Sequence, residues 1–183
     1  MRHGISRLFI LSVCAAFLTG CGSVNTTESI RATFDSGVAA YDAQDYPAAF
    51  KIFKSLEWKD VAAMRNAGLM LRKGEGVAKD PQAAMQLLAR AADAGMATAA
   101  SDLGEMLLKG EGGAPDAKAA LPWLEEAADA GHPVAEFNLA TIYEEGTAIP
   151  KDVAKARELY KDAAERGVPG AADRLAALPP VGS

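Results

Sequence analysis

Few side chains in this 183-residue chain could take part in covalent, redox or metal chemistry. The two cysteines are Cys14 and Cys21, and the two histidines are His3 and His132. His132 lies beside a predicted helix boundary with no cysteine or group of acids near it, so it is weak support for a metal site or a general base. No Ser-x-x-Lys motif is present, which removes one known type of serine nucleophile. These residues predict no catalytic site, no metal site and no cofactor.

The recurring acids and glycines have structural interpretations. Asp80, Asp116 and Asp152 are 36 residues apart and precede predicted helices, where aspartate is a favoured N-cap. The glycine-rich turns at 74–76 and 110–112 are not followed by the lysine and hydroxyl pair of a phosphate-binding loop. We therefore interpret both features as helix boundaries.

Cys21 has a chemical interpretation because of the segment before it. Arg2 and Arg7 precede an apolar run at residues 8–18, which is shorter than the roughly 20 residues that a membrane-spanning helix needs. This order is typical of a signal peptide. Together with the small residues just before Cys21, it resembles the lipobox of bacterial lipoproteins.

The lipobox resemblance implies that residues 1–20 are cleaved and that Cys21 becomes the lipidated first residue. Residues 21–29 would form a flexible tether, and the acyl chains would hold the protein on a membrane. Because residue 22 is glycine rather than aspartate, the resemblance implies a periplasm-facing protein, on the outer membrane if the organism has one. The alternative is an ordinary secretory signal that leaves Cys21 unmodified.

The composition favours packed helices and argues against nucleic-acid binding. Apolar residues make up 50% of the chain, charged residues 23% and aromatic residues 7%, and an apolar, aromatic-poor composition suits closely packed helices better than sheets. The net charge is −5, and −7 without residues 1–20, which carry two arginines and no acid. An acidic chain has no general attraction for nucleic-acid phosphates.

A repeat of 36 residues organises the rest of the chain. Several residue types recur at this spacing: Gly74, Gly110 and Gly146; Gly95, Gly131 and Gly167; Ala91, Ala127 and Ala163. Apolar periodicity predicts a first helix over 61–73, 97–109 and 133–145, and a second over 81–94, 117–130 and 153–166. Gly68 and Gly104 inside first helices predict close approach of a neighbouring backbone, and Pro122 predicts a local kink or a late helix start.

The repeat resembles the Sel-one-like repeat (SLR) family, a relative of the tetratricopeptide repeat. The resemblance is carried by AASDLGEMLLKGEGGAPDAKAALPWLEEAADAG and the two segments aligned with it. It implies an all-α fold, a right-handed α-α superhelix of helical hairpins. The expected units are a degenerate tetratricopeptide-like pair at 30–60, repeats at 61–96, 97–132 and 133–168, and a capping helix and tail at 169–183.

By resemblance to tetratricopeptide units, the first helix of each pair lines a concave binding face. Its outward positions would contact the partner: Arg65, Leu69, Arg72, Ser101, Glu105, Leu108, Phe137, Thr141 and Glu144. Arg65, Arg72 and Phe137 are the preferred anchors, because arginine and aromatic residues dominate interface energetics.

The family resemblance implies a non-enzymatic protein that binds another protein or an extended peptide in the cell envelope. We expect an adaptor or scaffold, for example in assembly of an exopolysaccharide, pilus or secretion system. Two alternatives stay open at the sequence level: an envelope enzyme acting on cell-wall or β-lactam substrates, and a module that binds peptidoglycan or another glycan.

Overall fold

Nine α-helices account for most of residues 26–179, the part of the chain that the computed structural model describes. No strand occurs among these residues, and the expected all-α class is confirmed. In chain order the helices are α1 (Thr26–Asp42), α2 (Tyr46–Leu56), α3 (Val61–Lys73), α4 (Pro81–Asp93), α5 (Ala97–Lys109), α6 (Ala117–Asp129), α7 (Pro133–Glu145), α8 (Val153–Glu165) and α9 (Ala171–Ala177). The expected signal peptide, Cys21 and residues 180–183 lie outside the described residues.

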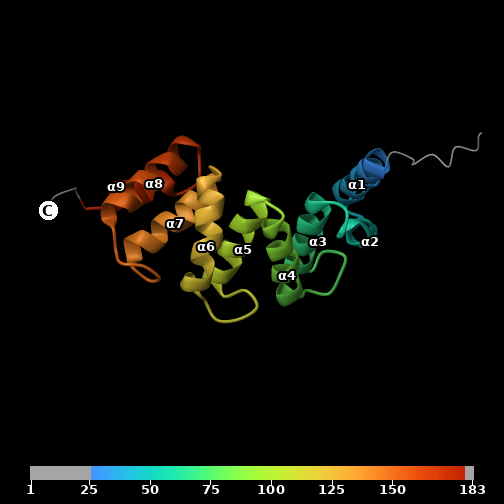
Figure 1. The fold of residues 1–183 in the computed structure, drawn as a ribbon, viewed down its shortest axis with the longest axis horizontal. Coiled ribbons are helices and arrows are strands. Elements are labelled where there is room, and N and C mark those ends of the chain that lie inside the picture. Colours follow the sequence, from blue (N-terminus) through green and yellow to red (C-terminus); the bar gives the residue numbers. More distant parts are fainter. Residues whose placement is uncertain (1–25, 180–183) are drawn as a thin grey trace, which may run out of the picture.

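Each 36-residue repeat is a helical hairpin, and the hairpins are stacked in chain order (Figure 1). Within the repeats α3 packs on α4, α5 on α6 and α7 on α8, while α4 packs on α5 and α6 on α7 between repeats. The first helices have the bounds predicted from the sequence, and each second helix ends one residue earlier than predicted. The hydrophobic periodicity therefore placed the repeat helices correctly.

Aspartate side chains start the second helices, as predicted. A carboxylate oxygen of Asp80 accepts a hydrogen bond from the Ala83 N–H at 3.0 Å, and Asp116 does the same for Ala119 at 2.9 Å. Asp152 caps α8 in the same way. These bonds satisfy backbone donors that have no partner within the helix.

Glycines end the first helices. Gly74, Gly110 and Gly146 have φ values of 81°, 68° and 71°. This is a left-handed backbone conformation that residues with a Cβ rarely adopt. The chain then turns into the loop that leads to the second helix. This is why these glycines recur at the repeat spacing.

The structure corrects the expected extent of the tether. Helix α1 begins at Thr26, so residues 26–29, which we assigned to the tether, are helical. The cause is an apolar stripe at Ile30, Phe34 and Val38, which packs against the core and extends the helix towards the N-terminus. The helix expected in the capping segment at 169–183 is α9 (Ala171–Ala177).

Small residues let the helices of the core approach closely, since many of its fully buried positions are alanine. A Cβ on Gly68 would lie 3.3 Å from the Ala84 carbonyl oxygen, so close approach to a backbone is confirmed there. At Gly104 the expectation was wrong, because the neighbour is the Leu124 side chain, whose Cδ2 would lie 2.5 Å from an added Cβ.

Pro122 does not delay the start of α6. The helix begins at Ala117 and contains the proline, so of the two predicted outcomes, a local kink or a late start, the late start is wrong. Proline removes one backbone donor, the one that would bond to the carbonyl of Lys118. Lys118 is exposed, and water can satisfy that carbonyl.

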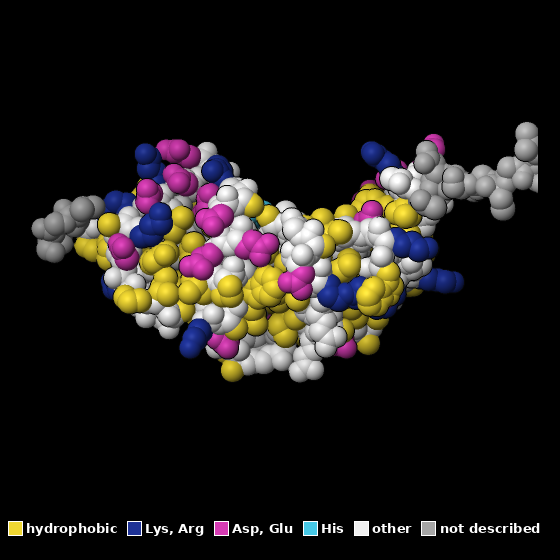
Figure 2. Space-filling model, viewed as in Figure 1, with side chains coloured by type: hydrophobic (Ala, Val, Ile, Leu, Met, Phe, Trp, Pro, Cys, Tyr) yellow, Lys and Arg dark blue, Asp and Glu magenta, His cyan; other side chains and the backbone are white. Residues whose placement is uncertain are grey.

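The array is an arc with a hollow on one edge (Figures 1 and 2). In Figure 1 the short turns that join one repeat to the next lie along the hollow edge, and the loops at 74–80, 110–116 and 146–152 lie along the other. These loops fill space between repeats: an added Cβ on Gly76 would lie 2.2 Å from the Tyr46 carbonyl carbon, and one on Gly112 would lie 3.4 Å from Pro81 Cβ. The loops thus widen the outer edge of the arc.

Candidate functional site

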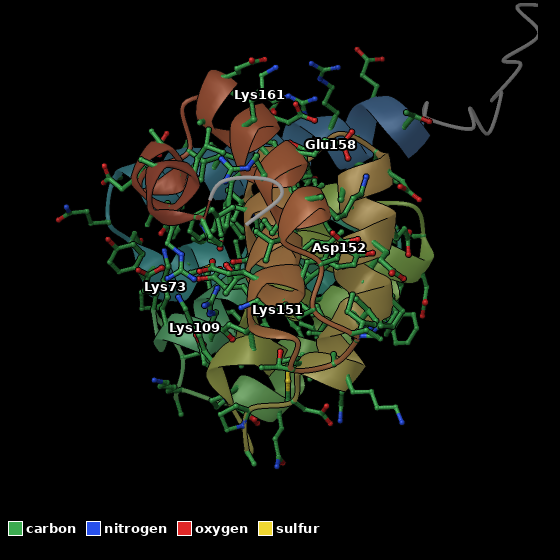
Figure 3. The ribbon with its side chains drawn as sticks, turned by 90° about the vertical axis from the view of Figure 1, so that its left-hand side faces the viewer. Lys73, Lys109, Lys151, Asp152, Glu158 and Lys161 are labelled. Atoms are coloured by element: carbon green, nitrogen blue, oxygen red, sulfur yellow. The ribbon has the colours of Figure 1, made fainter. Side chains whose placement is uncertain are left out.

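The residues predicted to bind a partner lie on α3, α5 and α7. Figure 3 looks along the array. Lys73 and Lys109, at the ends of α3 and α5, lie on one side of it, and Asp152 and Glu158, at the start of α8 and within it, lie on the other. We call these the first-helix side and the second-helix side. The first helices were expected to line the concave face, but they form one side of the arc, because the hollow runs along the helix ends.

Arg65 and Arg72, two of the preferred anchors, are bound within the molecule. Arg65 Nε lies 2.6 Å from an oxygen of Asp102 in the next repeat. Arg72 forms two hydrogen bonds to Glu111, at 2.7 and 2.5 Å, and its Nη1 lies 3.4 Å from Glu105. The Arg72 side chain is only 16% exposed. Both arginines therefore connect repeat to repeat.

The Arg72 cluster shifts the titration of its carboxylates. Hydrogen bonds from Arg72 hold the pKa of Glu111 below its ordinary value. Burial raises the pKa of Glu105, but hydrogen bonds from Lys109 and Arg72 outweigh burial and leave that pKa lowered. Both acids are thus stabilised in their charged form, as members of a structural ion-pair network.

Ser101 was wrongly expected to face outward. It is 2% exposed, because it follows Ala100 at the point where α5 packs against its neighbours and its small side chain fits among buried alanines. It can make no contact with a partner in this structure.

The predicted residues of α7 surround Tyr160, a fully buried side chain of α8. The Phe137 ring centroid lies 5.4 Å from that of Tyr160. The Tyr160 hydroxyl lies 2.9 Å from Thr141 Oγ1 and donates to Glu144 at 2.8 Å. Arg174 of α9 binds the same Glu144 carboxylate at 2.7 Å. This cluster fastens α9 to the last repeat.

Three of the predicted residues, Leu69, Leu108 and Thr141, line pockets. Leu108 borders a shallow pocket of about 430 Å³ between the 110–116 loop and α7, to which Thr141 also contributes. Leu69 borders a more enclosed pocket of about 230 Å³ between α1, α2 and α3. We call the latter the α1–α3 pocket.

The α1–α3 pocket has apolar walls and a polar rim. The walls include Val38, Phe53, Leu69 and Met70, and the rim is formed by Tyr41, Asn66, Lys73 and Glu75. The Tyr41 hydroxyl donates to Glu75 at 2.8 Å, and Lys73 Nζ lies 3.6 Å from the same carboxylate. The hydrogen bond to Glu75, with burial, raises the pKa of Tyr41. Tyr41 therefore stays neutral and keeps the rim ordered.

Of the pocket residues, our sequence analysis named only Leu69 as a binding residue. Val38, Tyr41 and Phe53 come from the degenerate pair α1–α2, which departs from the 36-residue pattern, and the rest come from the first repeat. The signal for a pocket in the sequence was the loss of the repeat pattern before residue 61, because an irregular junction leaves space that regular repeats fill. The pattern alone did not show which side chains would border that space.

His132 occupies the N-cap of α7 and is partly buried. Burial lowers its pKa, against the opposing effect of the Asp102 carboxylate. Its Nδ1 is buried without a hydrogen-bond partner among the described residues. Within residues 26–179, no group of three or more histidine, cysteine or acidic side chains is arranged to hold a metal ion, and no helix there is long and apolar enough to span a membrane.

Comparison with solved structures finds the same fold in other repeat proteins. A Sel1 repeat protein from Oxalobacter formigenes is 31% identical, with a TM-score of 0.71; the match covers 78% of this chain and 58% of that one. A protective antigen of uropathogenic Escherichia coli with an SLR fold is 24% identical over 80% of this chain and 32% of its own, with a TM-score of 0.74. Cysteine-rich protein B of Helicobacter pylori is 18% identical over 69% of this chain and 96% of its own, with a TM-score of 0.55.

The family model of the Sel1 repeat matches residues 61–96, 97–132 and 133–168, the boundaries that the sequence pattern predicted. No match is found among curated proteins. The chain spans little more than half of the Oxalobacter protein. Proteins built from Sel1 repeats generally mediate protein–protein interaction and typically have no enzymatic activity. With more than half of its length in three such repeats, stacked as in the solved relatives, the chain belongs to the Sel1 repeat family.

Proposed function

We propose that this protein is a lipid-anchored adaptor of the cell envelope that binds a segment of a partner protein in the α1–α3 pocket. The observation that carries the proposal is the pocket itself: apolar walls and a polar rim, formed where the pair α1–α2 meets the first Sel1 repeat. Recognition pockets usually combine an apolar interior with a few polar groups that orient the ligand.

The pocket chemistry fits a peptide with one bulky apolar side chain. A cavity of about 230 Å³ with Phe53, Leu69 and Met70 in its walls accepts a leucine or aromatic side chain. At the rim, the Asn66 side chain offers both a donor and an acceptor for a peptide backbone. Lys73, whose side chain is 53% exposed, offers a cation to an acidic neighbour of that apolar residue.

The rest of the first-helix side supports a rigid rather than an adaptable receptor. The ion pairs of Arg65 and Arg72 hold α3 on the next repeat, and the Tyr41–Glu75 hydrogen bond connects α1 to the loop after α3. A receptor that is ordered before binding loses less conformational entropy when the partner arrives.

The anchoring part of the proposal rests on the sequence before α1. The lipobox resemblance at Cys21 supports attachment to a membrane, with residues 22–25 and α1 between the lipid and the pocket. The pocket would thus lie near the membrane surface, where an adaptor could hold an envelope protein. Assembly of an exopolysaccharide, pilus or secretion system is the kind of process this position suits.

The test is photocrosslinking in cells with a photoreactive amino acid at position 69, followed by mass spectrometry of the captured proteins. We expect one dominant crosslinked protein, lost when Lys73→Glu is introduced in the same chain. Lys109→Glu is the matched control, because Lys109 stands 36 residues after Lys73, changes the net charge equally and is not part of the pocket.

Three results would count against the proposal. Crosslinking that is equal with Lys73→Glu and Lys109→Glu would place the partner elsewhere. Retention of the purified protein on peptidoglycan or polysaccharide would favour a glycan-binding module. Turnover of a cell-wall or β-lactam substrate, lost with His132→Ala, would favour an envelope enzyme.

A further inference from the structure

A second apolar surface lies on the second-helix side of the array, away from the α1–α3 pocket. It is a groove of about 480 Å³ between α4 and α6, with α5 as its floor. Its apolar lining consists of Met85 and Ala89 from α4, Leu103 and Leu107 from α5, and Ala119 and Trp123 from α6. Figure 2 shows hydrophobic side chains gathered between α4 and α6, with acidic side chains beside them.

The rim of this groove is acidic. Glu126 follows Trp123 by three residues and Asp93 follows Ala89 by four, so helical spacing places each acid one turn beyond a lining residue. Both acids are exposed, and neither has an ion-pair partner within residues 26–179. Of the eight acids from residue 81 to residue 129, Asp102, Glu105 and Glu111 are in ion pairs on the first-helix side. The other five acids (Asp93, Asp116, Glu125, Glu126 and Asp129) outnumber the two remaining bases, Arg90 and Lys118. The surroundings of the groove therefore favour a cationic partner.

The shape of the groove fits a helix. Its walls are neighbouring second helices of successive repeats, and a side-chain ridge of a third helix can pack between two such helices. Gln82 and Gln86 of α4 are exposed at the wall and can hydrogen-bond to polar side chains of that helix. An apolar stripe would cover Trp123 and Met85, while basic residues beside the stripe would reach Asp93 and Glu126.

We propose that the α4–α6 groove docks an amphipathic helix of a partner protein, with an apolar stripe bordered by lysine or arginine. A second copy of this chain that docked symmetrically through the same groove would bring the same acids against Asp93 and Glu126, and a membrane with anionic lipids would be repelled by them. The charge of the rim thus selects a basic helix over both. This second site is separate from the α1–α3 pocket and would let the adaptor hold two partners.

The test uses Trp123 as a fluorescent reporter. The other tryptophan, Trp58, is 76% exposed and lies outside the groove with the Arg90 guanidinium 3.7 Å above its ring, so Trp58→Phe leaves Trp123 as the only signal. The probes are three helical peptides of about 18 residues, each long enough for five turns. One has a leucine stripe bordered by lysine, one has glutamate in place of lysine, and one has serine in place of leucine.

We expect the lysine peptide to give a saturable blue shift of Trp123 emission, because the indole becomes covered. The glutamate peptide should bind at least about tenfold more weakly, since opposite charges across an interface set specificity. The double variant Asp93→Lys/Glu126→Lys should remove this preference. Asp42→Lys/Asp173→Lys is the matched control, with the same change in net charge at exposed positions on α1 and α9, and should keep it.

The proposal is overturned if the lysine peptide gives no saturable shift, or if it binds the double variant and the control equally. Binding of the serine peptide as tightly as the leucine peptide would show a purely electrostatic contact and would overturn the docking of an apolar stripe. Self-association through the groove, or a Trp123 shift with anionic vesicles but not with the peptide, would assign the groove to another occupant. Lys73→Glu should leave peptide binding unchanged, which separates this test from that of the α1–α3 pocket.

Discussion

Arg72 of α3 and Glu111 of the loop after α5 face each other across the junction of two repeats, with Nε 2.7 Å from Oε2 and Nη2 2.5 Å from Oε1. The residues that take the place of Arg72 in the next repeats are Leu108 and Glu144. The last junction therefore uses a different pair, in which Arg174 of α9 binds Glu144. Repeats with the same fold are joined by contacts that are particular to each junction.

The Arg72–Glu111 pair should contribute measurably to stability. We expect a double-mutant cycle with Arg72→Met and Glu111→Gln to give a coupling energy of about 1–3 kcal/mol, because the pair is bidentate and partly buried. Urea denaturation followed by circular dichroism at pH 7 measures it. The same cycle at Lys155 and Glu158, an exposed pair on α8, should give less than about 0.5 kcal/mol. Equal coupling energies at the two pairs would contradict the expected role of Arg72.

Acid should weaken the same junction. Hydrogen bonds from Arg72 lower the pKa of Glu111 in the folded protein, so the stabilisation is present above the ordinary carboxyl pKa of about 4.3 and is lost as pH falls through the lowered value. The unfolding free energy of Glu111→Gln should therefore approach that of the wild type as the pH falls below 4.3. A gap between the two proteins that stays constant from pH 7 to pH 3 would disprove the linkage.

Glu136 should behave in the opposite way. It is buried, one of its carboxylate oxygens has no partner among the described residues, and burial raises its pKa. A raised carboxyl pKa means that ionisation of Glu136 destabilises the folded protein. This destabilisation is absent below the ordinary carboxyl pKa of about 4.3 and is complete above the raised pKa. Glu136→Gln should thus unfold at an equal or higher denaturant concentration at pH 7. Arg166 also donates to the Gly131 carbonyl and keeps that partner.

A lower stability of Glu136→Gln at pH 7, by more than about 1 kcal/mol, would show instead that the Glu136–Arg166 ion pair outweighs the burial of the carboxylate. Arg166→Met is the control that removes the ion pair and leaves the carboxylate in place.

Gly104→Ala should destabilise the array although alanine is the better helix former. An added Cβ would lie 2.5 Å from Cδ2 and 2.6 Å from Cγ of Leu124, which is fully buried, and overpacking of this kind costs about 1–3 kcal/mol. The Leu124→Ala change should cost less in the Gly104→Ala background than alone, because it removes the clash. Thermal denaturation of the four proteins measures this. Strict additivity of the two changes would contradict the contact.

Cys21→Ala should release the protein from membranes. The lipobox resemblance makes the Cys21 thiol the site of lipid attachment, and no helix within residues 26–179 is long and apolar enough to span a membrane in place of the acyl chains. Fractionation of cells and incorporation of radioactive palmitate are the measurements, with Cys14→Ala as the control, because Cys14 lies in the segment that the resemblance assigns to the cleaved signal peptide. Label that persists in Cys21→Ala would show that the lipid is attached elsewhere.

The repeat architecture could be predicted from the sequence because it depends on local rules that recur every 36 residues. Apolar spacing set the helices, Asp80 and its equivalents started the second helices, and Gly74 and its equivalents ended the first ones. Each of these signals acts within a few residues of its own position. Each repeat could therefore be recognised by comparison with the next one, and the repeat pattern indicated the family.

The binding surfaces depended on contacts between residues that are far apart in the chain. Arg65 and Arg72 were expected to be free, but they meet acids 37 and 39 residues later, and outward position on a helix does not reveal such a partner. Trp123 was not among the predicted binding residues, yet it borders a groove made by three helices. The amino-acid sequence by itself determined the helices, their caps and their repetition, because local hydrogen bonding and periodic burial specify them. Only the tertiary structure decided which side chains remain available to a partner, because availability depends on how neighbouring repeats pack.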